Sequence, residues 1–207
     1  MGINYSKEEI LDGFRKAEAE RSYCLFTNLI DKNSLPQWSD FMNAAYHSAS
    51  QDMDDILDGQ INKNKEYLVG KLIIQAGVYF NFKGDYLDNI TLFPQVYNLL
   101  RITGEVPLGF YGPKVSIGPH FVTPHQDRWH AATLQCEGET IWTLKDEKYI
   151  SGEVSKFEKD DPNAMRIVLK PGDFLYFSQK LYHQIEVEGP RASLLFNSNG
   201  IVDIFSH

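Results

Sequence analysis

The strongest constraint on the fold is a change in the pattern of residue types that begins at Val115. From there onward the sequence consists of short runs rich in Val, Ile, Thr, Leu and aromatic residues, which are separated by Gly, Pro and Asp. Short runs of these residues with turn residues between them are typical of antiparallel strands in a barrel or sandwich. We therefore expect residues 115–207 to form a compact antiparallel β-domain, and the fold class to be mainly β.

The first half of the chain has helical spacing instead. Ser6-Lys7-Glu8-Glu9 is a capping-box pattern followed by apolar residues at helical intervals, which predicts a helix from about Ser6 to Glu20. A first strand is expected from Tyr23 to Leu29. Further helices are expected to begin near Ser34 and to run from about Pro94 to Arg101.

The length of the chain bears on its domain organisation. A chain of 207 residues with 43% hydrophobic content can bury a real core, but it is short for two independent domains. We expect one domain over residues 1–207. Within it, residues 1–114 would form a helical N-terminal region packed on the barrel, and residues 115–207 would form the β core with the functional site.

The net charge and the cysteine content limit the classes of binding partner and the cellular compartment that we expect. The formal net charge is -8 and no basic run occurs, which argues against nucleic acid and anionic membranes as partners. Cys24 and Cys136 cannot form a framework of several bridges, so we expect two thiols in a reducing compartment. No stretch resembles a signal peptide or reaches the apolar length that spans a bilayer. A cytoplasmic protein is the expectation, and the sequence leaves its oligomeric state open.

The chemistry of the chain is expected to centre on His125 and Asp127. These residues stand two apart, and in an extended strand residues i and i+2 project to the same face, so the imidazole and the carboxylate can converge on one ion. The best candidate for a third ligand is His183, which follows a Pro-Gly-Asp turn at 171–173 and an apolar strand. Ile185 and Val187 share its parity, so His183 is expected to point into the apolar interior.

Two nitrogens and one carboxylate on one side of an ion leave the opposite positions open. This ligand set suits Fe(II), which must bind a cosubstrate and dioxygen together. Zinc more often takes a closed tetrahedral set or a water-activating site. The competing interpretation is that these histidines are structural, since an isolated His-x-Asp occurs often by chance.

The segment from Ile117 to Asn197 resembles the cupin-like and Jumonji-type oxygenases that use Fe(II) and 2-oxoglutarate. The resemblance implies a double-stranded β-helix core, of the cupin or jelly-roll type, with N-terminal helices. It also implies a facial triad of His125, Asp127 and His183. The motifs that carry it are Thr123-Pro-His-Gln-Asp127, Leu134-Gln-Cys-Glu-Gly-Glu-Thr-Ile-Trp142, Pro171-Gly-Asp173, His183 and Asn197.

The sequence departs from this family at one position. Many Jumonji-type hydroxylases bind the distal carboxylate of 2-oxoglutarate with a lysine two residues after the glycine that corresponds to Gly138, and this chain has Thr140 there. Arg191-Ala-Ser193 resembles the Arg-x-Ser motif with which other 2-oxoglutarate oxygenases hold the same carboxylate. A planar guanidinium offers two parallel donors to a carboxylate, so the replacement is chemically sensible. The alternative for Arg191 is a surface position after a hairpin.

Two further residues are candidates for binding the cosubstrate. Asn197 resembles an Asn of Jumonji-type members that lies behind the metal ligands, although it is equally credible as a turn residue. Thr123 resembles a threonine of the family that contacts the cosubstrate, and its alternative is a structural hydroxyl before Pro124. No catalytic residue separate from the metal ligands is expected.

The leading functional hypothesis is a non-haem iron dioxygenase that uses 2-oxoglutarate and dioxygen to hydroxylate a small molecule, an amino acid or a peptide side chain. Because family halogenases generally lack a carboxylate at this ligand position, Asp127 favours hydroxylation. Two alternatives remain: a metal-dependent cupin acting as an isomerase or as a dioxygenase without 2-oxoglutarate, and a cupin that binds without turnover. Thr140, in place of the lysine, keeps the first of these alternatives open.

Overall fold

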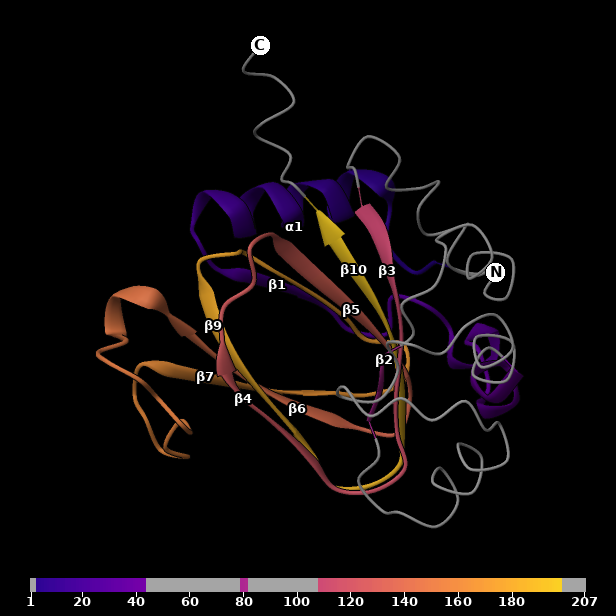
Figure 1. Ribbon diagram of the computed structural model, residues 1–207. Helices are drawn as coiled ribbons and strands as arrows, with labels where there is room; N and C mark the ends of the chain where they lie inside the picture. Colours follow the sequence, from indigo (N-terminus) through magenta and orange to yellow (C-terminus); the bar gives the residue numbers. More distant parts are fainter. Residues whose placement is uncertain (1–2, 44–78, 82–107, 199–207) are drawn as a thin grey trace.

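The computed structural model of the protein describes residues 3–43, 79–81 and 108–198 (Figure 1). Its helical elements are α1 (Lys7–Ala19), the short 3₁₀ turns η1 (Lys32–Ser34) and η2 (Glu147–Tyr149), and a helix over 38–43. Its strands are β1 (Tyr23–Phe26), β2 (Tyr79–Asn81), β3 (Leu108–Ser116), β4 (His120–His125), β5 (His130–Glu137), β6 (Thr140–Asp146), β7 (Ala164–Leu169), β8 (Phe174–Phe177), β9 (Leu181–Val187) and β10 (Arg191–Ser198).

The strands form two antiparallel sheets. The larger sheet has the order β1-β8-β5-β10-β3-β2, and the smaller has the order β4-β9-β6-β7. From β3 to β10 each strand lies in the other sheet from the strand before it, except that β6 and β7 are neighbours in the smaller sheet. This arrangement is the jelly-roll or double-stranded β-helix core, and it confirms the predicted fold class. In Figure 1 the two sheets face each other, and α1 lies across the outer face of the larger sheet.

Helix α1 has the ends that its sequence predicts. The hydroxyl of Ser6 accepts the backbone N–H of Glu9, and the carboxylate of Glu9 accepts the backbone N–H of Ser6, which completes the capping box. The helix buries Ile10, Leu11, Phe14 and Ala17 on one face. The Phe14 ring stacks on the ring of Tyr176 in β8, with 4.1 Å between the ring centroids. The apolar face of α1 therefore packs against the larger sheet.

The larger sheet separates two apolar clusters. One lies between α1 and the sheet and includes Val115, Phe174 and Tyr176, while the other lies between the two sheets and includes Leu175 and Phe177. Strand β8 is buried on both faces, and its alternate residues serve the two clusters in turn. Residues of this sheet that point away from α1 therefore face the interior of the barrel.

The structure corrects the expected division of the chain at residue 115. Strands β1 and β2 and most of β3 precede that residue, yet all three belong to the larger sheet. The start of β3 escapes a pattern analysis because Gly109, Gly112 and Pro113 interrupt the run of strand-forming residues. The expected helix at 94–101 lies outside the described residues, and the single-domain organisation remains a prediction.

Two further sequence expectations differ from the structure in their bounds. The first strand ends at Phe26 because the chain turns at Asn28, which has a φ of 52° and whose N–H donates to the carboxylate of Asp173 at 2.8 Å. The second helix begins at residue 38, several residues after Ser34, and follows Pro36. Its residue Phe41 belongs to the apolar cluster beneath α1, and Trp38 and Met42 pack against that cluster.

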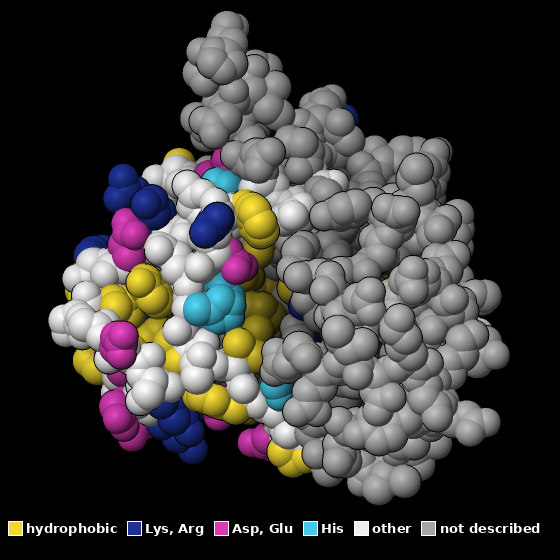
Figure 2. Space-filling view, viewed as in Figure 1, with side chains coloured by type: hydrophobic (Ala, Val, Ile, Leu, Met, Phe, Trp, Pro, Cys, Tyr) yellow, Lys and Arg dark blue, Asp and Glu magenta, His cyan; other side chains and the backbone are white. Residues whose placement is uncertain are grey.

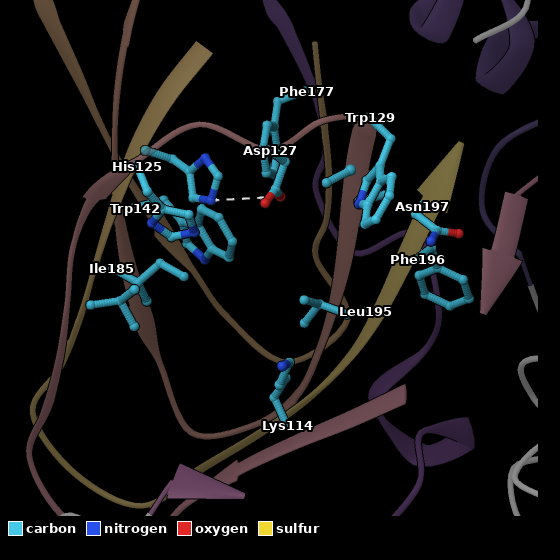
Figure 3. A pocket seen from close by; sticks show the side chains of 14 residues that line it. Lys114, His125, Asp127, Trp129, Trp142, Phe177, Ile185, Leu195, Phe196 and Asn197 are labelled. Atoms are coloured by element: carbon cyan, nitrogen blue, oxygen red, sulfur yellow. Dashed lines mark ion pairs between the residues drawn. The ribbon is translucent and has the colours of Figure 1, made fainter. Parts of the chain in front are cut away.

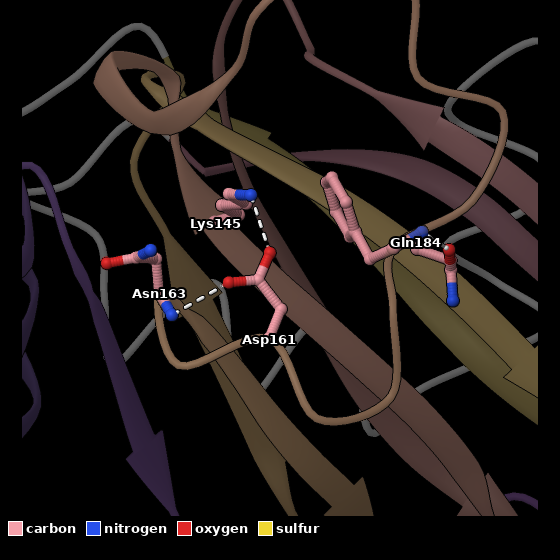
Figure 4. A network of polar contacts seen from close by, with 5 residues as sticks. Lys145, Asp161, Asn163 and Gln184 are labelled. Atoms are coloured by element: carbon pink, nitrogen blue, oxygen red, sulfur yellow. Dashed lines mark hydrogen bonds and ion pairs between the residues drawn. The ribbon is translucent and has the colours of Figure 1, made fainter.

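The segment between β6 and β7 is fastened to the smaller sheet by the polar contacts drawn in Figure 4. The Lys145 ammonium pairs with the Asp161 carboxylate at 2.6 Å, and that carboxylate also accepts the backbone N–H of Asn163 at 2.9 Å. The side chain of Gln184 accepts the backbone N–H of Phe157 at 2.7 Å. Because this segment covers it, Gln184 is 1% exposed even though it points away from the barrel interior.

No helix among residues 3–43, 79–81 and 108–198 is long and apolar enough to cross a membrane.

Candidate metal centre

The smaller sheet brings His125 and His183 together. They are register partners on the antiparallel strands β4 and β9, and their ring centroids lie 4.1 Å apart. Asp127 follows the end of β4 by two residues, and its Oδ2 lies 3.8 Å from Nε2 of His183. Ligand atoms of the three side chains all lie within 4.8 Å of one another. Among the described residues, this is the one group of three or more His, Cys, Asp or Glu side chains close enough to share an ion.

Strand alternation explains why His183 points inward. Ile185 and Val187 have the same parity and lie in the apolar cluster between the two sheets. His183 is 2% exposed, and its ring lies 4.8 Å from that of Phe177. The position of His183 in the interior therefore agrees with the prediction from the sequence.

A backbone contact orients His125. Its Nδ1 lies 2.9 Å from the carbonyl oxygen of Thr123, a distance at which the ring nitrogen donates a hydrogen bond. A proton on Nδ1 leaves the lone pair on Nε2, which is the tautomer that a metal-binding imidazole requires. Thr123 thus contributes its carbonyl group to the site.

Burial shifts the pKa values of two of the three side chains. Burial, together with the neighbouring charge of His125, lowers the pKa of His183 to about 3, so its imidazole stays neutral. Burial raises the pKa of Asp127, although the charges of His125 and Lys114 oppose this shift. A dication beside Asp127 would stabilise its carboxylate, and a neutral imidazole is the form of histidine that binds metals.

The three side chains face a cavity between the two sheets (Figure 3). Most of its wall is apolar, with Trp129, Trp142 and Phe177 as the largest members. The polar members of the wall are Lys114, His125, Asp127, His183 and Asn197. Polar groups set in a mostly apolar wall are the usual composition of a ligand site.

An indole donor in this wall fits a site that binds a polar group. Trp142 is 3% exposed, and its Nε1 has no hydrogen-bond partner among the described residues. A buried N–H without an acceptor costs free energy that a bound ligand oxygen would recover. Together with the donor set of two imidazoles and one carboxylate, this fits a metal ion that carries a small oxygen-rich ligand.

The candidate cosubstrate residues divide into two groups. Asn197 lines the cavity, whereas Arg191, Ser193 and Thr123 are not among the residues of its wall. Arg191 and Ser193 are buried, and Nη1 of the guanidinium donates to Oγ of the serine at 2.6 Å. Further along the same strand as Arg191 and Ser193, Leu195 and Asn197 line the cavity.

Lys114 lines the cavity, and sequence analysis missed it. Only 5% of this residue is exposed, and Figure 3 shows it reaching into the cavity from the side opposite His125 and Asp127. The available signal was parity, since Lys114 alternates with Val115, which packs under α1. That signal was lost because the β-domain was expected to begin at Val115.

Thr140 occupies the position of the family lysine without replacing its charge. It is 1% exposed and donates its hydroxyl proton to Oε1 of Gln135 at 3.0 Å. It does not line the cavity. Within the described residues, the cation in the wall of the cavity therefore comes from β3 and not from β6.

The outer surface near the smaller sheet mixes charge and apolar groups. In the view of Figure 2, histidine side chains lie beside acidic and apolar side chains on the part of the face that is described. Trp129, a member of the cavity wall, is 38% exposed. Trp129 is thus both a part of the cavity wall and a part of the protein surface.

Comparison with known proteins agrees with this geometry. Residues 111–200 match the family model of the JmjC domain. This chain is 42% identical to the bifunctional lysine-specific demethylase and histidyl-hydroxylase NO66 of Drosophila persimilis over 76 residues. The match covers 34% of this chain and 11% of that protein. The chain is 30% identical to ribosomal oxygenase 1 of Rattus norvegicus over 105 residues, which are 46% of the chain and 18% of the relative.

Solved structures show the same fold. The ribosomal oxygenase YcfD from Escherichia coli superposes with a TM-score of 0.58 at 13% identity, over 99% of this chain and 54% of YcfD. YcfD in complex with cobalt and 2-oxoglutarate gives a TM-score of 0.56 at 12% identity, over 94% of this chain and 51% of that one. The chain therefore spans about half of the solved relatives and less than a fifth of the two curated relatives named above.

Proposed function

We propose that this chain, which carries a JmjC domain over residues 111–200, is an Fe(II)- and 2-oxoglutarate-dependent oxygenase that hydroxylates a peptide side chain. The observation that carries the proposal is the convergence of His125, Asp127 and His183 on one side of an apolar cavity. Two imidazoles and one carboxylate hold Fe(II) by one face and leave the other face for cosubstrate and dioxygen.

Each side chain has a role in this proposal. His125 and His183 bind the ion through neutral imidazoles, and Asp127 supplies the one negative charge of the ligand set. The apolar wall formed by Trp142 and Phe177 excludes water from the reacting atoms. When bound, Fe(II) with 2-oxoglutarate and dioxygen supplies the oxidising chemistry, which yields succinate and carbon dioxide and inserts one oxygen atom into a C–H bond.

A peptide substrate is favoured by the names of the relatives. NO66 is named for reactions at lysine and histidine, and the two others are named ribosomal oxygenases. A side chain of a peptide is therefore the substrate class that we propose in preference to a free small molecule. Trp129, which is partly exposed and also lines the cavity, is positioned to contact a side chain that enters from the surface.

The test is formation of succinate by the purified chain supplied with Fe(II), 2-oxoglutarate and ascorbate in air. The chain should release succinate above the rate of a protein-free reaction. Asp127→Ala should abolish this release. Asp12→Ala is the matched control, because it also removes a carboxylate, but from the exposed surface of α1.

Absence of succinate from the unaltered chain, with no binding of 2-oxoglutarate to the metal-loaded protein, would refute the proposal. A metal-dependent cupin without a 2-oxoglutarate requirement would then be favoured, as the uncharged Thr140 allows. Release of succinate that is equal for the chain and Asp127→Ala would show that the metal acts elsewhere.

A further inference from the structure

Two buried cations lie on neighbouring strands of the larger sheet, and only one of them faces the cavity. Lys114 on β3 pairs in register with Ser193 on β10, and Arg191 pairs with Ser116. Arg191 and its partner are thus two register positions further along the ladder than Lys114 and its partner. The cavity wall includes Lys114 but not Arg191.

The side chain of Arg191 is directed toward other groups. Its Nη1 donates to Ser193 at 2.6 Å inside the protein, and 3% of the residue is exposed. Burial lowers the pKa of His120, and the positive charge of Arg191 lowers it further. His120 is at the start of β4, the opposite end of that strand from His125.

Lys114, in contrast, is a member of the cavity wall and reaches it from β3. Figure 3 shows the amino group pointing into the cavity, with Leu195 beside it and the candidate ligands on the far side. The cavity therefore has a carboxylate and two imidazoles at one end and an ammonium group at the other.

We infer that Lys114, and not Arg191, is the cation that binds the distal carboxylate of 2-oxoglutarate in this protein. The inference rests on the proposed function and assigns the residue that selects a dicarboxylate. A 2-oxo dicarboxylate has two recognition ends, of which the 2-oxo acid belongs to the metal and the other carboxylate needs a cation. An ammonium group in an apolar wall forms a strong charge-assisted hydrogen bond with such a carboxylate.

The position of Thr140 supports this assignment. Its hydroxyl is short, is bonded to Gln135 and lies outside the cavity wall, so β6 brings no charge to the cosubstrate. Lys114 reaches the same cavity from β3, in the opposite sheet. The chain thus retains a cation for the carboxylate but takes it from a different strand, and Arg191 serves to position Ser193 and the start of β10.

The test is calorimetric titration of the Mn(II)-loaded protein with two 2-oxo acids in the absence of turnover. One is 2-oxoglutarate, and the other is 2-oxopentanoate, which has the same chain length but lacks the distal carboxylate. Lys114→Met should weaken 2-oxoglutarate roughly 10- to 100-fold, the range expected for loss of one charge-assisted hydrogen bond, and should leave the affinity for 2-oxopentanoate unchanged. Lys114→Arg should keep the preference for 2-oxoglutarate.

Arg191→Gln is the matched variant, because it removes the other buried cation of the same sheet. It should change the ratio of the two affinities less than threefold, whatever it does to the melting temperature. Equal 2-oxoglutarate affinity in Lys114→Met and the unaltered chain, or a selective loss in Arg191→Gln alone, would overturn the assignment while leaving the proposed function intact. Failure of the unaltered chain to bind either acid would overturn both.

Discussion

Replacing Gly138 by alanine should destabilise the protein far more than the same change at two other glycines. Gly138 lies in the turn between β5 and β6 with a φ of 63°, and a Cβ atom there would lie 2.0 Å from the carbonyl oxygen of Pro190. The left-handed conformation costs a non-glycine residue roughly 1–2 kcal/mol. Moving the backbone of the β9–β10 turn aside adds about 1–3 kcal/mol, as other overpacked sites do. The free energy of unfolding should thus fall by about 2–5 kcal/mol.

Gly152 and Gly189 separate the two contributions. Gly152 has a φ of 70° but nothing within 4 Å of an added Cβ, so Gly152→Ala should cost only the roughly 1–2 kcal/mol of the left-handed conformation. Gly189 also has open space and no such φ, so Gly189→Ala should change stability by less than about 0.5 kcal/mol. The three variants form a series in which only Gly138→Ala has both costs.

Urea denaturation followed by tryptophan fluorescence measures the differences. With a slope of about 2 kcal/mol per molar urea, Gly138→Ala should lower the midpoint by about 1–2.5 M. Equal midpoints for Gly138→Ala and Gly152→Ala would refute the reasoning, because they would show that the β5–β6 turn does not press against Pro190.

Two other predictions concern the packing around α1. Burial raises the pKa of Cys24 to about 12 and that of Cys136 well above its usual value, so both thiols stay protonated at pH 8 and should react with iodoacetamide only after unfolding; rapid modification of the native protein, read by intact mass, would contradict this. Phe14 is fully buried and packs on Phe26, Phe174 and Tyr176, so Phe14→Ala should lower the free energy of unfolding by about 3–5 kcal/mol in the same urea assay. A loss below about 1 kcal/mol would show that α1 contributes little to the core.

Local signals in the sequence predicted the parts of the fold that depend on local interactions. The capping box placed the start of α1, because Ser6 and Glu9 satisfy each other's backbone groups without help from distant residues. Strand parity predicted that His183 points inward with Ile185 and Val187, since alternation follows from backbone geometry alone. The pairing of β4 with β9, which brings His125 beside His183, was not predicted. The choice of His183 as third ligand came from its sequence context and from the family resemblance.

Features that depend on distant segments were not predictable in the same way. Gln184 shares the outward parity of Glu186, yet it is buried because the segment around Phe157 folds over it. Lys114 was overlooked because Gly112 and Pro113, which are uncommon in strands, precede it and weaken the sequence signal for β3. Its role depends on the opposite sheet, and no spacing within one strand reveals which side chains meet across a cavity.

The central claim is that His125, Asp127 and His183 hold one divalent metal ion. Titration of the metal-free protein with Mn(II), followed by calorimetry and by electron paramagnetic resonance, tests it directly. The unaltered chain should bind one ion, and Asp127→Ala and His183→Ala should each bind it at least about 100-fold more weakly while keeping the circular dichroism of the folded protein, because the ligands line a preformed barrel. Unchanged Mn(II) affinity in both variants would contradict the account.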